Sequence, residues 1–314
     1  MGVIGSTSTV ARRAVIPALE KSGHCQLVAT ASLSDPGATH PSYEALLEDA
    51  AVEAVYIPLP NSLHRQWTER AAAAGKHVLC EKPLAASAED ALAMRDACAA
   101  AGVVLMEAYM TQFHPRSKKL GELVASGLIG EFLFASAAFT GVLDRARDHR
   151  WRPEMGGGAL LDVGIYCITP MLAAAGVGGP DGVPQVSGVA RRAALGVDAS
   201  YSGWLDLGGG RAAAFQCSFE APERQALEIV GTKAALSVKR AFTPGIDDRE
   251  ILVHNRDGST DVVTTDGGDP YLLMVEHFGA VVRGEAALER TPAASVALQR
   301  LIDRLASVGA PGTG

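Results

Sequence analysis

The stretch Ala54–Cys80, with the sequence AVYIPLPNSLHRQWTERAAAAGKHVLC, decides the fold class of this chain. It opens with a short apolar run, Ala54–Pro58, continues through an alanine-rich segment of helical length, Leu63–Ala74, and closes with a second apolar run, His77–Cys80. Continuous apolar strands separated by one helix are typical of a βαβ unit in a parallel sheet that helices cover on both faces. The stretch therefore predicts two parallel strands joined by a crossover helix.

The same alternation continues on both sides of this unit. Further strands are predicted at Gly2–Gly5, Leu27–Ser32 and Val103–Tyr109, and further helices at Val10–Lys21, around Tyr43–Asp49 and at Ala88–Ala101. Because crossovers between parallel strands are right-handed, a doubly wound Rossmann sheet is the expected topology. The turn sequence Asp35-Pro36-Gly37 follows the second strand and predicts that the crossover helix there is short or absent.

After Tyr109 the pattern changes to runs of strands with segregated helices. Strands are predicted at Phe132–Thr140, Gln185–Arg192, Ser200–Leu207, Ala212–Phe219, Ala226–Val230 and Ile251–His254, and helices at His114–Ser126, Ala159–Ala175, Tyr271–Val282 and Ala294–Leu305. This pattern predicts an α+β domain built on a mostly antiparallel open sheet. We therefore expect a dinucleotide-binding domain over residues 1–109 and an α+β domain over residues 110–314.

Composition excludes several classes of protein. The 314 residues are 48% hydrophobic and carry a formal net charge of −7, which argues against a nucleic-acid-binding protein because such a protein needs a basic surface. No stretch approaches 18 uninterrupted apolar residues, and the N-terminus opens directly into a strand, so we expect no membrane span and a cytoplasmic protein. The five cysteines are scattered without CxxC spacing, which favours free thiols over a disulfide frame or a zinc site: Cys25, Cys80, Cys98, Cys167 and Cys217.

The turn after the first strand is a candidate pyrophosphate site. It contains Gly5, Ser6, Thr7, Ser8 and Thr9, at a position where the N–H groups of a helix N-terminus would face a phosphate. Only Gly5 remains of the usual G-x-G-x-x-G pattern, and hydroxyl side chains, which can donate to phosphate oxygens, fill the positions that follow. The alternative is a merely structural strand–turn–helix connection.

The ends of the second and third strands supply further candidate cofactor contacts. No carboxylate stands at the end of the second strand to bind a ribose 2′-hydroxyl, and Ser32 there would receive a 2′-phosphate, although no arginine follows it in the loop. We therefore favour NADP(H) over NAD(H). Pro58, Asn61 and His64 follow the third strand and would touch the cofactor; an ordinary place at a helix N-terminus is the alternative for His64.

Glu81-Lys82-Pro83 follows the fourth strand, at the sheet edge where open α/β folds bind their ligands. The Lys82 ammonium there would donate to a substrate oxygen and to the nicotinamide ribose, and would stabilise charge that develops on a reduced carbonyl. Glu81 beside it is a further candidate cofactor contact. The alternative is a solvated Glu–Lys pair before a helix.

A second candidate segment is the glycine-rich run at residues 156–166. Asp162 and Tyr166 are four residues apart, so one helix face would present a carboxylate and a phenol to the same ligand. The alternative is a capping role for Asp162 and a core position for Tyr166. Trp151 and Arg152, just upstream, would supply a stacking face and a cation near the cofactor or the substrate.

Taken in order, these segments resemble one known family. They are the strand–turn–helix opening, VYIPLPNSLH (55–64), GKHVLCEKPLA (75–85), LMEAYMTQFHP (105–115) and GGGALLDVGIYCI (156–168). The chain resembles the glucose–fructose oxidoreductase / inositol dehydrogenase / MocA (Gfo/Idh/MocA) family, and within it the sugar ketoreductases. The resemblance implies that Lys82 lies beside the reacting carbon, that Tyr166 is the proton donor and that Asp162 holds substrate hydroxyls. It also implies a homo-oligomer, a dimer or tetramer, formed through the open sheet.

These observations predict an NAD(P)-dependent oxidoreductase that acts on a sugar or sugar nucleotide, with Lys82 and Tyr166 converging on one substrate oxygen. No metal ion is expected to take part. Two alternatives stay open at this point: a regulator that binds dinucleotide and sugar without catalysis, which the eroded glycine pattern favours, and a glycosidase of the same family that uses the nicotinamide transiently.

Overall fold

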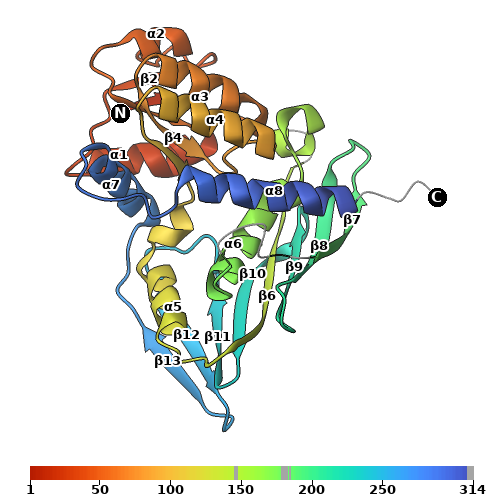
Figure 1. The fold of residues 1–314 in the computed structure, drawn as a ribbon. Helices are drawn as coiled ribbons and strands as arrows, with labels where there is room; N and C mark the ends of the chain where they lie inside the picture. Colours follow the sequence, from red (N-terminus) through yellow and green to blue (C-terminus); the bar gives the residue numbers. More distant parts are fainter. Residues whose placement is uncertain (145–147, 178–182, 184, 310–314) are drawn as a thin grey trace. The chain divides into compact units, whose positions relative to one another are not determined.

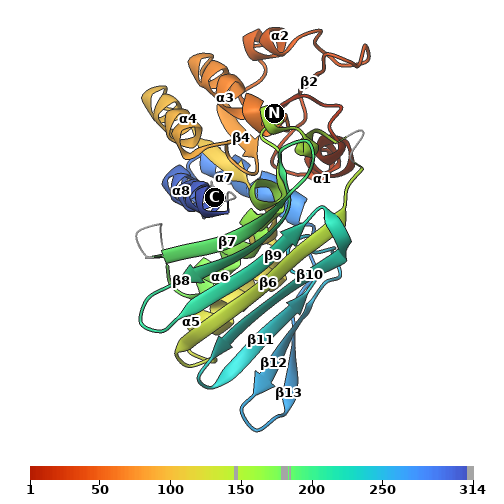
Figure 2. The ribbon, with the colours of Figure 1, turned by 90° about the vertical axis from the view of Figure 1, so that its right-hand side faces the viewer.

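The computed structural model describes residues 1–144, 148–177, 183 and 185–309. The chain forms two compact units. The first contains Met1–Met110 and Tyr271–Gln299, and the second contains Thr111–Pro270 and Arg300–Gly314. Each unit is built on one sheet (Figures 1 and 2).

The first unit contains a five-stranded sheet whose paired strands are all parallel, in the order β2-β1-β3-β4-β5. Its strands are β1 (Gly2–Ile4), β2 (Ala29–Ala31), β3 (Ala54–Ile57), β4 (His77–Glu81) and β5 (Leu105–Ala108). The strand order reverses beside β1, which is the type of position where ligands bind in doubly wound sheets. The predicted Rossmann topology is confirmed.

The helices of this unit follow the predicted alternation. They are a π-helical turn (Ala11–Val15) that runs into α1 (Ile16–Lys21), α2 (Tyr43–Glu48), a 3₁₀ turn (Asn61–Leu63) that leads into α3 (His64–Ala73), α4 (Ala88–Ala100) and α7 (Pro270–Val282). The crossover helix α2 is short, as the turn sequence before it predicts. α3 and α4 lie side by side (Figure 1), and Trp67 of α3 meets Tyr43 of α2 edge-on at 4.8 Å between ring centroids.

The second unit contains an eight-stranded sheet in the order β13-β12-β11-β10-β6-β9-β8-β7. Only the pair β6–β9 is parallel, and the other pairs are antiparallel. The strands are β6 (Phe132–Val142), β7 (Gln185–Arg192), β8 (Asp198–Asp206), β9 (Ala212–Ser218), β10 (Glu220–Gly231), β11 (Ala234–Lys239), β12 (Glu250–Asn255) and β13 (Thr260–Thr264). This matches the predicted α+β architecture.

Helices cover one face of this sheet. They are α5 (Pro115–Ala125) and a π-helical turn (Leu160–Gly164) that continues as α6 (Ile165–Ala174). Figure 2 shows α5 and α6 behind the strands, and α6 packs on β6, β9 and β10. The segment Pro153–Ala174 is the one stretch among the described residues that is long and apolar enough to cross a membrane, but 61% of its apolar window is buried inside the protein. It is therefore a core helix of this unit.

The fold differs from the sequence prediction in three places. The segment 271–299 belongs to the first unit, although we expected it in the α+β domain. Helix α7 is held there by the buried side chains of Met274, Val275 and Phe278. The Cys25 thiol also donates to the Val275 carbonyl. Strands β11 and β13 were not predicted. β13 reads TDVVT and stands at the sheet edge, where none of its residues is buried, so it carries a weak hydrophobic signal.

Candidate active site

The turn after β1 is built around Gly5. This residue has φ +77°, and a Cβ atom there would come within 2.6 Å of the Leu59 side chain, so both backbone and space require glycine. The N–H groups of Gly5 and Ser6 donate to the carbonyl of Ala31 at 2.8 and 3.1 Å. These bonds tie the start of the turn to the end of β2.

The hydroxyl side chains of this turn divide between two roles. Ser8 accepts the N–H of Ala11 at 3.1 Å and thereby caps the following helix. Thr7 lies 3.3 Å from the hydroxyl of Ser32, which lies 3.4 Å from the hydroxyl of Ser34. The structure thus brings Thr7 of the turn and Ser32 of the β2 end together, whereas Ser6 is buried and Thr9 is exposed.

Sequence reasoning missed an arginine that stands beside this hydroxyl cluster. Arg12 reaches from the helix after the turn to Asp35 in the loop after β2, with 3.0 Å between Nη2 and Oδ2. The loop itself contains no arginine. The signal that could have found it is the position of Arg12 on the helix that follows the glycine turn, because this helix runs beside the loop.

The Glu81-Lys82-Pro83 segment is held by a buried hydrogen bond. The Tyr56 hydroxyl of β3 donates to Glu81 Oε1 at 2.7 Å, and the Lys82 backbone N–H donates to Glu81 Oε2 at 3.2 Å. Burial, reinforced by the neighbouring Glu81 charge, raises the pKa of Tyr56 well above its ordinary value. The phenol therefore stays protonated and remains a donor. The Lys82–Pro83 peptide bond is cis, and the Lys82 side chain is half-buried.

His64 fixes the same segment from the other side. Its ring is fully buried, with Nε2 at 2.8 Å from the Leu59 carbonyl and Nδ1 at 3.1 Å from the Pro83 carbonyl. Burial lowers the pKa of His64. Both ring nitrogens face carbonyl oxygens within the chain, and the neutral ring donates to one of them, so His64 packs in place between the Leu59 and Pro83 segments. Pro58 and Asn61, the other candidates after β3, are also buried.

A third buried group reaches the segment from β5. Glu107 accepts the Leu84 N–H at 2.9 Å through Oε1, while Oε2 accepts the Ser295 hydroxyl at 2.6 Å and lies 3.0 Å from Nε of Arg290. The Arg290 guanidinium also stands 5.2 Å from the centre of the Tyr109 ring. Sequence reasoning missed Arg290 because nothing in its own neighbourhood marks it as the partner of a residue on β5.

In the second unit, Asp162 pairs with an arginine. Arg150 Nε lies 3.0 Å from Asp162 Oδ2, and Arg150 Nη1 lies 2.9 Å from Asp148. The Asp162 carboxylate raises the pKa of Arg150, burial opposes this rise, and Asp148 adds to it. The net pKa of Arg150 lies above its ordinary value. Asp162 is buried, and Arg150 remains about one-third exposed. Arg150 is a third residue that sequence reasoning missed, although it directly precedes Trp151.

Tyr166 lies within an aromatic group. Its ring meets Phe139 of β6 edge-on at 5.4 Å and stands 6.3 Å from Phe242. Trp151 is fully buried and packs edge-on against Phe219, so its indole offers no exposed stacking face of the kind we expected. Arg152 is exposed, as a cation that reaches a ligand would need to be. Lys82 belongs to the first unit and Tyr166 to the second, and their convergence on one oxygen stays a prediction.

Comparison with known proteins identifies the family. Residues 2–109 match the oxidoreductase family with an NAD-binding Rossmann fold (GFO_IDH_MocA), and residues 117–237 match the GFO/IDH/MocA C-terminal domain. The chain belongs to the GFO/IDH/MocA oxidoreductases. Among the described residues of this family member, no group of three or more His, Cys, Asp or Glu side chains could hold a metal ion.

Several relatives of this GFO/IDH/MocA chain carry an activity in their names. It is 37% identical to D-xylose 1-dehydrogenase (NADP(+)) 2 of Haloferax volcanii, over 97% of this chain and 95% of that protein. It is 36% identical to a dTDP-3,4-didehydro-2,6-dideoxy-alpha-D-glucose 3-reductase of Streptomyces violaceoruber, over 90% of this chain and 85% of that protein. Among solved structures, the chain is similar to KijD10, a 3-ketoreductase from Actinomadura kijaniata in complex with NADP and TDP-benzene. The TM-score is 0.88 at 29% identity, and the match covers 98% of this chain and 96% of KijD10.

Proposed function

We propose that this chain reduces the carbonyl group of a ketosugar, free or linked to a nucleotide, with NADPH. The observation that carries the proposal is the scaffold around Lys82. Three buried groups contact the segment from Glu81 to Leu84: Tyr56 donates to Glu81, the His64 ring faces the Pro83 carbonyl, and Glu107 accepts the Leu84 N–H. Burying so many polar groups is costly unless they are satisfied, and their common effect is to hold one lysine in a single position.

The proposed roles follow from the chemistry of each side chain. Lys82 donates to the substrate carbonyl oxygen and stabilises the negative charge that develops on it. Tyr166 transfers its hydroxyl proton to that oxygen, so that the carbonyl becomes an alcohol. Asp162, oriented by Arg150, accepts a hydrogen bond from a substrate hydroxyl. When bound, NADPH would supply the hydride to the carbonyl carbon.

The relatives support the assignment of Lys82 and Tyr166. Solved variants of KijD10 include ones with a lysine replaced by alanine and a tyrosine replaced by phenylalanine. The same number of residues separates that lysine from that tyrosine as separates Lys82 from Tyr166. Such equal spacing is what we expect if both chains carry the pair at matching positions.

The residues of the first unit also fit a dinucleotide with a 2′-phosphate. Gly5 allows close approach of the turn, and the hydroxyls of Thr7, Ser32 and Ser34 form one cluster of donors. Arg12 adds a cation beside this cluster, while Asp35, the one nearby carboxylate on the loop, is already paired with Arg12. An arginine and hydroxyls favour a phosphate over a bare ribose hydroxyl.

We also propose that the protein is a cytoplasmic homo-oligomer, a dimer or tetramer, that associates through the uncovered face of the eight-stranded sheet. That face exposes half of Trp204, 46% of Phe134 and 74% of Val189. Between them stand small side chains, since Trp204 pairs with Ala214 and Phe134 with Ala212. Large exposed apolar groups on a flat face mark an interaction surface.

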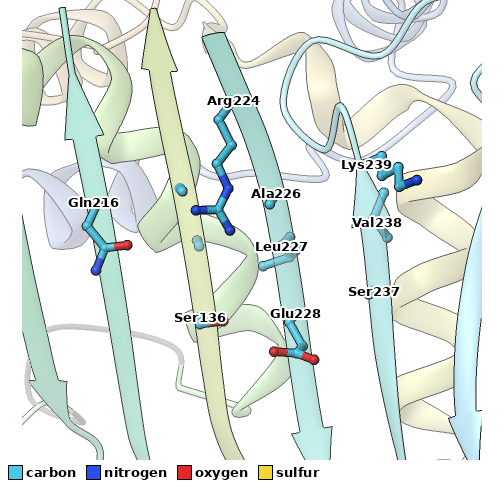
Figure 3. A pocket seen from close by; sticks show the side chains of 11 residues that line it. Ser136, Gln216, Arg224, Ala226, Leu227, Glu228, Ser237, Val238 and Lys239 are labelled. Carbon is cyan, nitrogen blue, oxygen red and sulfur yellow. The ribbon is translucent and has the colours of Figure 1, made fainter. Parts of the chain in front are cut away.

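A shallow depression in the middle of this face is shown in Figure 3. Gln216, Arg224 and Glu228 project from β9 and β10 around Ser136 of β6. Arg224 and Glu228 lie four residues apart on one strand. In a twofold pairing of two such faces, the arginine of each copy can meet the glutamate of the other. The five thiols, all free in the structure, suit the reducing cytoplasm.

Replacing Lys82 tests the activity. Lys82→Met should lower the rate of NADPH oxidation with a ketosugar by about a hundredfold or more, since the substituted chain loses the charge that stabilises the developing alkoxide. NADPH binding by fluorescence and the melting temperature should change little. The matched control is Lys76→Met, which removes a lysine whose Nζ donates to the Asp49 carbonyl. Near-normal turnover by Lys82→Met would overturn the assignment, and NADPH binding by the wild type without turnover of any ketosugar would favour the regulator.

A further inference from the structure

Asp198, at the start of β8, is a partly buried carboxylate that neither the motifs nor the proposed chemistry uses. Its Oδ2 accepts the Leu160 N–H at 2.6 Å, and the Ala159 N–H lies near enough to lower the pKa of the carboxylate. These two N–H groups open the helical segment that carries Asp162 and Tyr166. A carboxylate at this place satisfies first-turn donors that have no partner inside the helix.

The glycine before this helix is shaped to admit the carboxylate. Gly158 has φ +124°, and a Cβ atom there would collide with Asp198 Oδ1. Gly158 N–H donates to the Arg150 carbonyl at 3.0 Å, and the side chain of that same arginine pairs with Asp162. The first turn is therefore held at two points, by Asp198 on one side and by the backbone of Arg150 on the other.

We propose that Asp198 is a positioning residue for catalysis, whose charged carboxylate holds the first turn of this helix so that Asp162 and Tyr166 face the substrate. The inference rests on the proposed function. A charge-assisted hydrogen bond is shorter and stronger than a neutral one, so loss of the charge loosens this turn. Displacement of a reacting group by a fraction of an ångström is enough to slow a reaction.

The charge is held at a cost to stability. Burial raises the pKa of Asp198 to about 6, against the opposing effects of the Leu160 N–H, its own N–H, the Arg192 charge on β7 and the Ala159 N–H. Tyr201 of β8 and Cys217 of β9 also face it; burial raises the pKa of each, and the Asp198 charge adds a smaller rise. Between the unfolded pKa and about 6, the folded chain binds more protons than the unfolded chain, so this group's contribution to stability falls as pH rises. Above pH 6 that loss is complete.

Stability and activity therefore respond to Asp198→Asn in opposite directions. The amide keeps an acceptor for one N–H but carries no charge, so at pH 7.5 the variant should melt about 2–5 °C higher than the wild type. Its kcat should be roughly fivefold to tenfold lower, with an unchanged Kd for NADPH. The wild-type kcat should fall as pH drops through about 6, and this acid limb should be absent from the variant. A purely structural residue would not lower kcat while raising the melting temperature.

The matched control is Asp206→Asn, at the other end of β8, where the carboxylate accepts the Gly208 N–H at 2.8 Å. It should leave both kcat and its acid limb unchanged. An Asp198→Asn variant that keeps wild-type kcat, or that keeps the acid limb, would overturn the proposal. A readout without turnover separates this failure from failure of the proposed function: the amide proton resonance of Leu160 should titrate near pH 6 in the wild type and lose that titration in the variant.

Discussion

The two units hold their reactive side chains in different ways. Around Lys82, the partners are buried: in the Glu107–Arg290 pair, the side chains are 1% and 8% exposed. Around Asp162, the partner Arg150 is 35% exposed, and Tyr166 rests against aromatic rings. Water can compensate a half-exposed charge but not a buried one. We therefore expect substitutions around Lys82 to lower stability, and substitutions around Asp162 and Tyr166 to lower activity.

The largest expected effect is in the first unit. Arg290→Met leaves Glu107 buried without its cation, and we expect a loss of about 3–5 kcal/mol in the free energy of unfolding, measured by urea titration. Arg283→Met, which breaks the exposed ion pair with Glu285, is the control and should leave stability close to that of the wild type. Recovery of part of the loss in the double variant Glu107→Gln/Arg290→Met would sharpen the interpretation. A loss for Arg290→Met as small as that of the control would break the comparison.

Tyr166→Phe should show the opposite behaviour. The ring keeps its contacts with Phe139 and Phe242 while the proton donor is lost, so kcat should fall about a hundredfold at a nearly unchanged melting temperature. Tyr201→Phe is the control, because its hydroxyl donates to the Leu305 carbonyl at 2.6 Å inside the second unit. It should lower stability and spare kcat. An equal loss of kcat in the two variants would contradict the role of the Tyr166 hydroxyl as the proton donor.

Arg150→Met should mainly affect substrate binding. Without the guanidinium, Asp162 is no longer oriented, and we expect KM for the ketosugar to rise about tenfold. The stability loss should be smaller than that of Arg290→Met, because the Asp162 side chain left behind is 10% exposed whereas that of Glu107 is 1% exposed. Initial rates over a range of sugar concentrations measure the first effect. Arg95→Met, at an exposed pair with Asp96, is the control. An unchanged KM would show that Asp162 needs no such orientation.

The smallest expected effect concerns the cofactor. Arg12→Met should weaken NADPH binding about twofold to fivefold at physiological salt and leave NADH binding unchanged, because only the former carries the 2′-phosphate. Asp35→Asn should strengthen NADPH binding by releasing Arg12. Arg13→Met, the next residue of the same helix, is the control. Equal effects of Arg12→Met on the two cofactors would place Arg12 away from the 2′ position.

Much of the fold and of the candidate site follows from local sequence. Alternating apolar strands and helices predict the Rossmann sheet, and Lys82, Asp162 and Tyr166 stand within short motifs that mark them directly. The Ser87 cap of α4 and the His114 cap of α5 can likewise be inferred from a few residues, and both are present. In each of these places the physical cause lies within one turn or one strand.

The residues that sequence reasoning missed owe their roles to distant partners. Arg290 matters because of Glu107, Tyr56 because of Glu81, and Asp198 because of a glycine turn that precedes it by 40 residues. An isolated arginine or tyrosine carries no mark of burial. The pairing appears only when the chain has folded and the two strands or segments lie side by side.

The return of α7 and of residue 290 to the first unit has a consequence for the order in which the protein is made. A ribosome releases Glu107 long before Arg290, and residues 111–270 of the second unit are synthesised between them. During synthesis the first unit therefore carries Glu107, at the end of β5, without its cation Arg290 until almost the entire polypeptide has emerged. A truncated product that ends before residue 271 would lack α7 and this ion pair, and would be a poor substitute for the Rossmann unit on its own.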